Sequence, residues 1–139
     1  MPKSSVKGNG TKEKPWQLKT PSGQSDIQAY RDEASDPPAL VIIASNTEVR
    51  YQLRVLDDMQ AMLKAHGDWM ALGTADEQKT AAEGTVEAWA RSPKNPVGGW
   101  YGLKKGLRGR VGNYIPPVME ALDLAEVEHN PRNNRIRAK

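Results

Sequence analysis

The apolar hexapeptide ALVIIA, residues 39–44, decides the fold that this sequence predicts. It is apolar throughout and β-branched at its centre, which is typical of an interior strand covered on both faces. Breakers (SDPP, residues 35–38) precede it and a turn (SNT, residues 45–47) follows it, so strands can pair with it on both sides. We therefore expect this segment inside an antiparallel sheet.

Three neighbouring segments have the alternating pattern of half-buried strands, and they are Trp16–Lys19, Asp26–Glu33 and Glu48–Leu53. Together with residues 39–44 they predict a four-stranded antiparallel meander within residues 15–54. The hydrophobic period then changes from two to 3.6, and Leu56, Met59 and Leu63 form the apolar stripe of a helix that ends before Gly67. This helix is expected to cover one face of the sheet.

Residues 74–139 are predicted to be mainly helical. Thr74 and Glu77 form a capping box for a short helix that ends at Gly84. Thr85 can cap the next helix, Val86–Arg91, whose expected buried side is Val86, Trp89 and Ala90. A further helix is expected to begin at Asn113, with Pro116 and Pro117 in its first turn and Val118–Leu122 as its body. The segments Leu124–Glu128 and Arg135–Ala138 predict a closing β-hairpin.

The fold class expected from these elements is α+β, with a four-stranded meander and its helix followed by a helical half that ends in a hairpin. The predicted organisation is a flexible basic tail over residues 1–14, a sheet-plus-helix unit over 15–73 and a helical unit over 74–139. Either one domain or two small halves sharing a core fits a chain of 139 residues.

The segment GGWYGLKKGLRGR, residues 98–110, has two readings. On a helix, Trp100, Leu103 and Leu107 would form an apolar stripe, with the lysines and arginines on a second side and four glycines on a third. Interior glycine weakens a helix by about 1 kcal/mol per residue relative to alanine, so close backbone approach would have to compensate. The alternative is a partly irregular segment whose glycines serve turns.

The distribution of basic residues favours an anionic ligand for the C-terminal third of the chain. Residues 98–139 carry eight basic and four acidic groups, although the whole chain has a net charge of only +3. Guanidinium and ammonium groups contact phosphates, and aromatic rings stack on bases. The predicted nucleic-acid-binding residues are Lys104, Lys105, Arg108, Arg110, Arg132, Arg135, Arg137, Trp100 and Tyr101. The alternatives are a module that binds an acidic protein partner or another copy of itself, or ordinary solvated charge.

No catalytic site, metal site or cofactor is predicted. The chain has no Cys, which removes thiolate ligands and cysteine nucleophiles, and its two histidines lie in different elements. The carboxylate pairs at 57–58 and 76–77 are explained by helix N-termini. Residues 1–14 have no apolar stretch typical of a secretory signal, so none is expected there, and the longest apolar run is far shorter than the roughly 20 residues of a membrane span. We expect a soluble, cytoplasmic protein that makes no membrane contact.

Two resemblances follow from these motifs. The order of helices and hairpin from Trp89 onward resembles the winged helix-turn-helix, which implies Asn113–Leu122 as recognition helix and His129–Arg135 as wing tip. That helix has no Lys or Arg, so DNA contacts would fall to residues 104–110 and the wing. The blocks HGDW, EGTVEAWARSP, GGWYGLKKGLRGR and EVEHNPRNNR resemble small uncharacterised bacterial proteins, chiefly actinobacterial.

Overall fold

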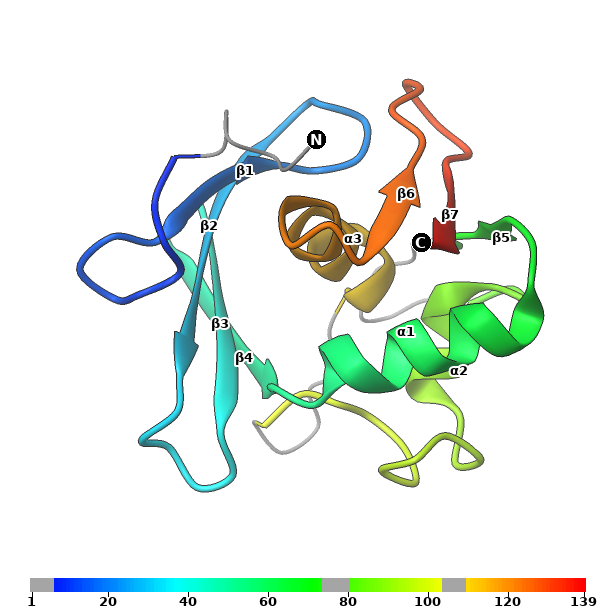
Figure 1. The fold of residues 1–139 in the computed structure, drawn as a ribbon, viewed down its shortest axis with the longest axis horizontal. Coiled ribbons are helices and arrows are strands. Elements are labelled where there is room, and N and C mark those ends of the chain that lie inside the picture. Colours follow the sequence, from blue (N-terminus) through cyan, green and yellow to red (C-terminus); the bar gives the residue numbers. More distant parts are fainter. Residues whose placement is uncertain (1–6, 74–80, 104–109) are drawn as a thin grey trace.

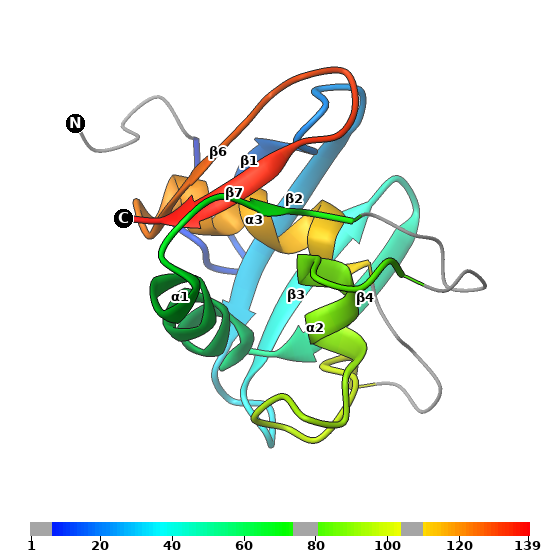
Figure 2. The same ribbon diagram turned by 90° about the vertical axis from the view of Figure 1, so that its right-hand side faces the viewer.

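The computed structural model describes residues 7–73, 81–103 and 110–139 of the chain. These residues form two antiparallel sheets and three helices, an α+β fold (Figures 1 and 2). The predicted fold class is therefore confirmed. None of the helices in the described residues is long and apolar enough to cross a membrane.

The first sheet is the predicted meander, with strand order β1-β2-β3-β4. Its strands are β1 (Trp16–Lys19), β2 (Asp26–Asp32), β3 (Ala39–Ala44) and β4 (Thr47–Gln52). Ile42 in β3 lies opposite Ala29 of β2 and Val49 of β4, so β3 is paired on both sides. Leu40 and Ile42 enter the main core, whereas Val41 packs with Tyr30 in a small second cluster on the other face. The ALVIIA segment is thus an interior strand, as its composition predicts.

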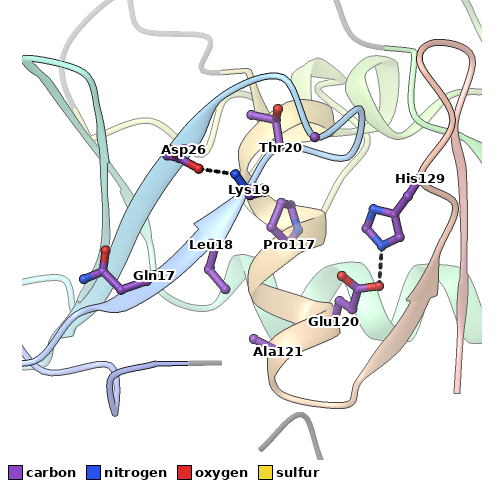
Figure 3. A pocket seen from close by; sticks show the side chains of 10 residues that line it. Gln17, Leu18, Lys19, Thr20, Asp26, Pro117, Glu120, Ala121 and His129 are labelled. Carbon is purple, nitrogen blue, oxygen red and sulfur yellow. Dashed lines mark hydrogen bonds and ion pairs between the residues drawn. The ribbon is translucent and has the colours of Figure 1, made fainter. Parts of the chain in front are cut away.

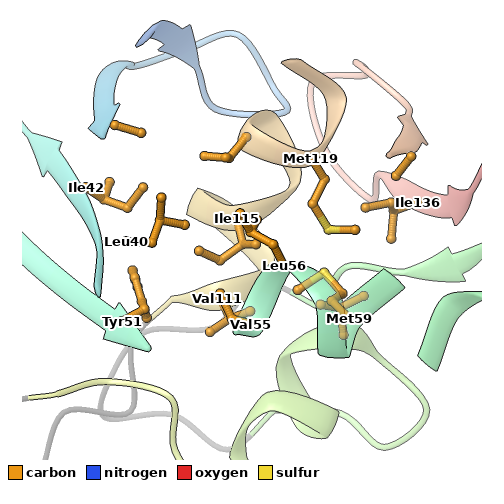
Figure 4. Close-up of a cluster of buried hydrophobic side chains, with 14 of the residues drawn as sticks. Leu40, Ile42, Tyr51, Val55, Leu56, Met59, Val111, Ile115, Met119 and Ile136 are labelled. Atoms are coloured by element: carbon orange, nitrogen blue, oxygen red, sulfur yellow. The ribbon is translucent and has the colours of Figure 1, made fainter. Parts of the chain in front are cut away.

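Helix α1 (Val55–His66) follows the meander, and Gly67 ends it in the left-handed conformation. It buries Val55, Leu56, Met59 and Leu63 against the core (Figure 4). The predicted helix, its apolar face and its glycine stop are therefore confirmed.

The second sheet has the order β5-β7-β6 and is antiparallel. The remaining elements are β5 (Met70–Ala71), α2 (Val86–Arg91), α3 (Val111–Ala121), β6 (Ala125–Val127) and β7 (Arg135–Ala138). Helix α3 lies between the first sheet and the β6–β7 hairpin (Figure 1). A single hydrophobic cluster runs from Trp16 to Ile136, so the two halves of the chain share one core.

The segment from Gly98 to Leu103 is not helical, which corrects the helical reading of residues 98–110 for the part that the structure describes. Its backbone pairs with the edge of β4 instead. The Gln52 amide donates to the Tyr101 carbonyl at 2.9 Å, and the Leu103 amide donates to the Arg50 carbonyl at 2.9 Å. These sheet-like bonds satisfy the backbone without a helix, and Leu103 packs against the small second cluster.

The predicted start of the last helix is also wrong. Helix α3 begins at Val111, so Asn113 is its third residue, and Pro116 and Pro117 lie inside it. Its cap comes from another helix, because Glu87 of α2 accepts a hydrogen bond from the Gly112 amide at 3.0 Å. A tertiary contact therefore replaces the local side-chain cap that the sequence predicts.

Two other predictions fall partly outside the described residues. The first is the short helix expected to begin at the capping box. Residues 74–77 of the capping box lie outside the described residues, and residues 81–84, where the helix was expected to end, are coil and turn. Residues 7–14, predicted as part of a flexible tail, are bonded to the first sheet. The Arg31 amide donates to the Gly10 carbonyl at 2.9 Å, and Gly10 is buried under the Trp16 indole.

Candidate functional site

The structure brings two of the residues predicted to bind nucleic acid to one cavity. Lys104, Lys105 and Arg108 lie outside the described residues. Of the others, Arg110 and Arg132 line the same cavity, although they lie far apart in the chain. Arg135, Arg137, Trp100 and Tyr101 do not line it.

This cavity, which we call the arginine cavity, has a volume of about 340 Å³. Three segments enclose it: the β1–β2 turn, the start of α3 and the β6–β7 turn. Its described lining is Thr20, Pro21, Ser22, Gln24, Ser25, Leu72, Arg110, Asn113, Pro131, Arg132, Asn133 and Asn134. The lining has two guanidinium groups, several amides and hydroxyls, and no carboxylate among the residues that the structure describes. Such a donor set suits an anion.

The β6–β7 turn holds Arg132 in place. The buried Asn134 side chain closes this turn, because its Nδ2 donates to the Asn130 carbonyl at 2.9 Å and its Oδ1 accepts from the Asn130 amide at 2.6 Å. The Asn134 carbonyl also accepts from the Leu72 amide at 3.0 Å, which ties the turn to the floor of the cavity. Arg132 is exposed at the tip of an ordered turn.

The start of α3 holds Arg110. Its backbone amide donates to the Tyr51 hydroxyl at 3.3 Å, and its guanidinium lies 5.7 Å from the centre of the Tyr114 ring. The neighbouring Gly112 has no room for a side chain, since a Cβ atom there would lie 2.6 Å from the Leu72 carbonyl oxygen. Close packing of α3 on Leu72 therefore sets where Arg110 lies.

Glu87 completes this arrangement, and its side chain is fully buried. It accepts from the Gly112 amide and from Nε of Arg91, at 3.0 and 3.1 Å. Burial raises the pKa of Glu87, and the bonds to Gly112 and Arg91 oppose this rise. The Gly112 amide already donates its hydrogen bond to Glu87, so it is not available to an anion in the arginine cavity. Such an anion would be bound chiefly by side chains. The sequence shows Glu87 and Arg91 only as an i, i+4 pair and gives no sign of burial.

A second residue that the sequence did not mark is His129. Its Nε2 lies 2.6 Å from Glu120 Oε2, and its Nδ1 lies 3.0 Å from the Pro21 carbonyl oxygen (Figure 3). A carbonyl and a carboxylate both accept, so satisfying the two contacts requires an N–H on each ring nitrogen, which is the imidazolium form. His129 thereby connects the β6–β7 turn to α3 and to the β1–β2 turn. No local pattern predicts this role.

His129 belongs to a larger cavity of about 680 Å³ on the other side of the β1–β2 turn. We call it the paired cavity, because its cations face carboxylates: His129 bonds to Glu120, and Lys19 bonds to Asp26 at 2.6 Å (Figure 3). Both ring nitrogens of His129 are engaged, so the ring is not poised to accept a proton from a substrate in this arrangement. Within the described ranges, no cluster of three or more His, Cys, Asp or Glu could hold a metal ion.

The arginines of β7 are matched by one acid on β6 and one that directly follows it. Arg135 makes two bonds to Glu128, at 3.0 and 2.7 Å, and Arg137 makes two to Glu126, at 3.2 and 3.3 Å. The hydrogen bond from Arg135 lowers the pKa of Glu128. Lys139 likewise pairs with Asp123. The basic cluster predicted at the C-terminus is therefore largely neutralised by acids that precede it in the chain.

The two aromatic residues have different surroundings. Tyr101 is completely buried, and its hydroxyl donates to Asp58 at 2.9 Å, so its ring offers no free face for a base. Burial raises the pKa of Tyr101, and the bond to Asp58 adds to this rise. Trp100 is 41% exposed and is the large hydrophobic side chain that the described residues leave at the surface.

Comparison with known proteins places the chain in a family. A model described as "Family of unknown function (DUF6855)" matches residues 8–139. No curated protein and no solved structure matches. This confirms the resemblance to an uncharacterised family. The chain therefore belongs to the DUF6855 family, a family of unknown function.

Proposed function

We propose that this protein is a non-enzymatic binding protein that takes nucleic acid through its phosphate groups. The observation that carries the proposal is the meeting of Arg110 and Arg132 in one polar cavity with no carboxylate among its described lining. Arginine is suited to this task because its planar guanidinium can donate two parallel hydrogen bonds to phosphate oxygens.

The neighbouring sequence supports the same ligand. Lys104, Lys105 and Arg108 precede Arg110 directly, and no acid lies among them. Because Arg135, Arg137 and Lys139 are paired with acids, we assign the phosphate contacts to five residues rather than to all eight C-terminal cations. They are Lys104, Lys105, Arg108, Arg110 and Arg132.

The test is fluorescence anisotropy with labelled duplex DNA, single-stranded DNA and RNA at about 50 mM salt. We expect binding of at least one of the three, with log K falling by about 3.5 to 4.5 per unit of log salt concentration, from five contacts at ~0.7 to 0.9 each. Dissociation constants above about 100 μM for all three, the weak end of non-specific binding, would reject nucleic acid.

The second candidate is a protein-interaction module, which the exposed Trp100 favours. Tryptophan is enriched at interfaces, where it often contributes a large part of the binding energy. If this reading holds, replacing Trp100 by Ala weakens self-association in analytical ultracentrifugation or weakens capture of an acidic partner, and nucleic acid does not bind.

A further inference from the structure

We propose that the chain's own N-terminal segment, residues 4–6, adds to the open edge of β1 as a short antiparallel strand and covers the paired cavity. Residues 1–6 precede the part of the chain that the structure describes. The proposal concerns the paired cavity and not the arginine cavity, so it does not depend on nucleic-acid binding.

Within the described ranges, β1 pairs with β2 and has an open edge on its other side. The Thr20 amide donates to the Ser25 carbonyl at 3.0 Å, and bonded residues alternate along an antiparallel pair of strands. The backbone groups of Gln17 and Lys19 therefore point away from β2. The Gln17 amide donates in this direction to the Lys7 carbonyl, at 2.9 Å. The Lys19 amide and carbonyl have no backbone partner there in the part of the chain that the structure describes.

The paired cavity lies along this edge. Gln17 and Lys19 are exposed on the outer face of β1, whereas Leu18 is buried on the core face. All three residues line the cavity, so it follows the edge of the strand and not one face. Pro117 and Ala121 of α3 line the core side of the same cavity (Figure 3). An open strand edge beside apolar side chains favours the addition of an extended segment.

The chain that precedes β1 already runs antiparallel to it. The Lys7 carbonyl accepts from the Gln17 amide at one end of this connection. At the other end, the Asn9 and Gly10 amides both donate to the Lys14 carbonyl, at 2.9 and 3.1 Å. Partners that approach each other along the chain in this way belong to an antiparallel pair. Residues before Lys7 that continue in this direction follow the open part of the β1 edge.

The register selects the residue that enters the cavity. Counted back from Lys7, it puts Val6 opposite Leu18. It puts Ser5 opposite Lys19, where the two residues can exchange both backbone hydrogen bonds. Opposite residues of an antiparallel pair share a face, so Val6 faces the apolar side of the cavity with Leu18. Val6 is also the one Val, Ile or Leu among residues 1–14.

Connection to Lys7 favours this occupant over a separate peptide. Three residues, 4–6, span the open edge from Leu18 to Thr20, and six residues precede Lys7, so the segment is long enough. A tethered segment also binds at a high effective concentration, which a separate peptide lacks.

The test is amide hydrogen exchange of the full chain, followed by NMR. We expect the Lys19 amide to exchange about tenfold more slowly than in an unfolded chain, or slower still, because it donates to Ser5. The Val127 amide is the reference. It lies on the edge of β6 that β7 does not occupy, since the next amide, that of Glu128, donates to Arg135 of β7. Exchange at Lys19 as fast as at Val127 would leave the edge open to a partner and overturn the proposal.

Two proline variants separate strand pairing from other sources of protection. Ser5→Pro removes the N–H that donates to the Lys19 carbonyl, so Lys19 should return to fast exchange. Ser4→Pro is the matched control, because the Ser4 N–H points away from β1, and it should retain the protection. Neither position belongs to the hydrophobic core, so both variants should fold. Protection that survives Ser5→Pro would overturn the proposal.

Val6 variants test the placement in the cavity. Val6→Asp puts a charge beside Leu18 and should abolish the protection of Lys19, whereas Val6→Ile should retain it. Protection that Val6→Asp leaves unchanged would overturn this placement. Protection that rises with protein concentration, together with a dimer in analytical ultracentrifugation, would assign the segment to a second copy and overturn the intramolecular strand.

Discussion

The arginine cavity and the paired cavity lie on either side of the β1–β2 turn, and Thr20 lines both. In the paired cavity, Lys19 and His129 each face a carboxylate at 2.6 Å. In the arginine cavity, the described residues beside Arg132 carry amides and hydroxyls and no carboxylate. The difference shows that a count of basic residues does not predict where charge is available to a ligand. Pairing with acids from other elements decides it.

The largest effect is expected where α3 is anchored beneath the arginine cavity. Glu87→Ala removes the buried carboxylate that caps α3 and leaves Arg91 without this partner. We therefore expect the free energy of unfolding to fall by about 3 to 5 kcal/mol. Urea denaturation measures this loss. Glu48→Ala, at an exposed ion pair, is the control and should change stability by about 0.5 kcal/mol or less. A loss below about 1 kcal/mol for Glu87→Ala would mean that this anchor is unimportant.

Gly112→Ala tests the anchoring of α3 through a packing contact, whereas Glu87→Ala tests it through a buried charge. In an ordinary helix position this change would stabilise the protein by up to about 1 kcal/mol. Here the added Cβ would meet the Leu72 carbonyl oxygen, so we expect destabilisation of about 1 to 3 kcal/mol and weaker binding in the arginine cavity. Thermal denaturation gives the sign directly, and a rise in Tm would contradict the close contact.

Matched substitutions in the two cavities test the comparison itself. Arg132→Gln should weaken nucleic-acid binding about tenfold and reduce the magnitude of the salt slope by about 0.9 for duplex DNA. Lys19→Gln removes a cation that is already paired with Asp26 and should change neither quantity. The measurement is anisotropy over a series of salt concentrations. Equal losses from both variants would show that the cavities do not differ in available charge.

The smallest effect concerns His129. Its ring connects the β6–β7 turn to Glu120 of α3 and to the Pro21 carbonyl of the β1–β2 turn, so we expect His129→Gln to destabilise the protein. The side chain is half exposed, which limits the loss to about 0.5 to 1 kcal/mol. Urea denaturation of the two proteins measures this loss, and equal stability would contradict a stabilising role for the two contacts.

Local pattern predicted much of the fold correctly. The four strands, α1 and the β6–β7 hairpin were predicted because alternation and helical period reflect which side chains are buried, and both can be read from adjacent residues. The errors occur where partners are distant. Residues 98–103 follow the edge of β4, and α3 begins two residues before Asn113, because Arg50, Gln52 and Glu87 satisfy their backbone groups.

The sequence by itself determined the elements, the lack of cysteine chemistry and the presence of basic residues in the C-terminal third. Only the tertiary structure decided which of those charges are neutralised. The register of β6 on β7 places Glu126 opposite Arg137, and the β6–β7 turn brings Arg132 to the same cavity as Arg110. The physical reason is that secondary structure depends on neighbours in the chain, whereas electrostatic pairing depends on distances of a few ångströms between residues that the chain keeps far apart.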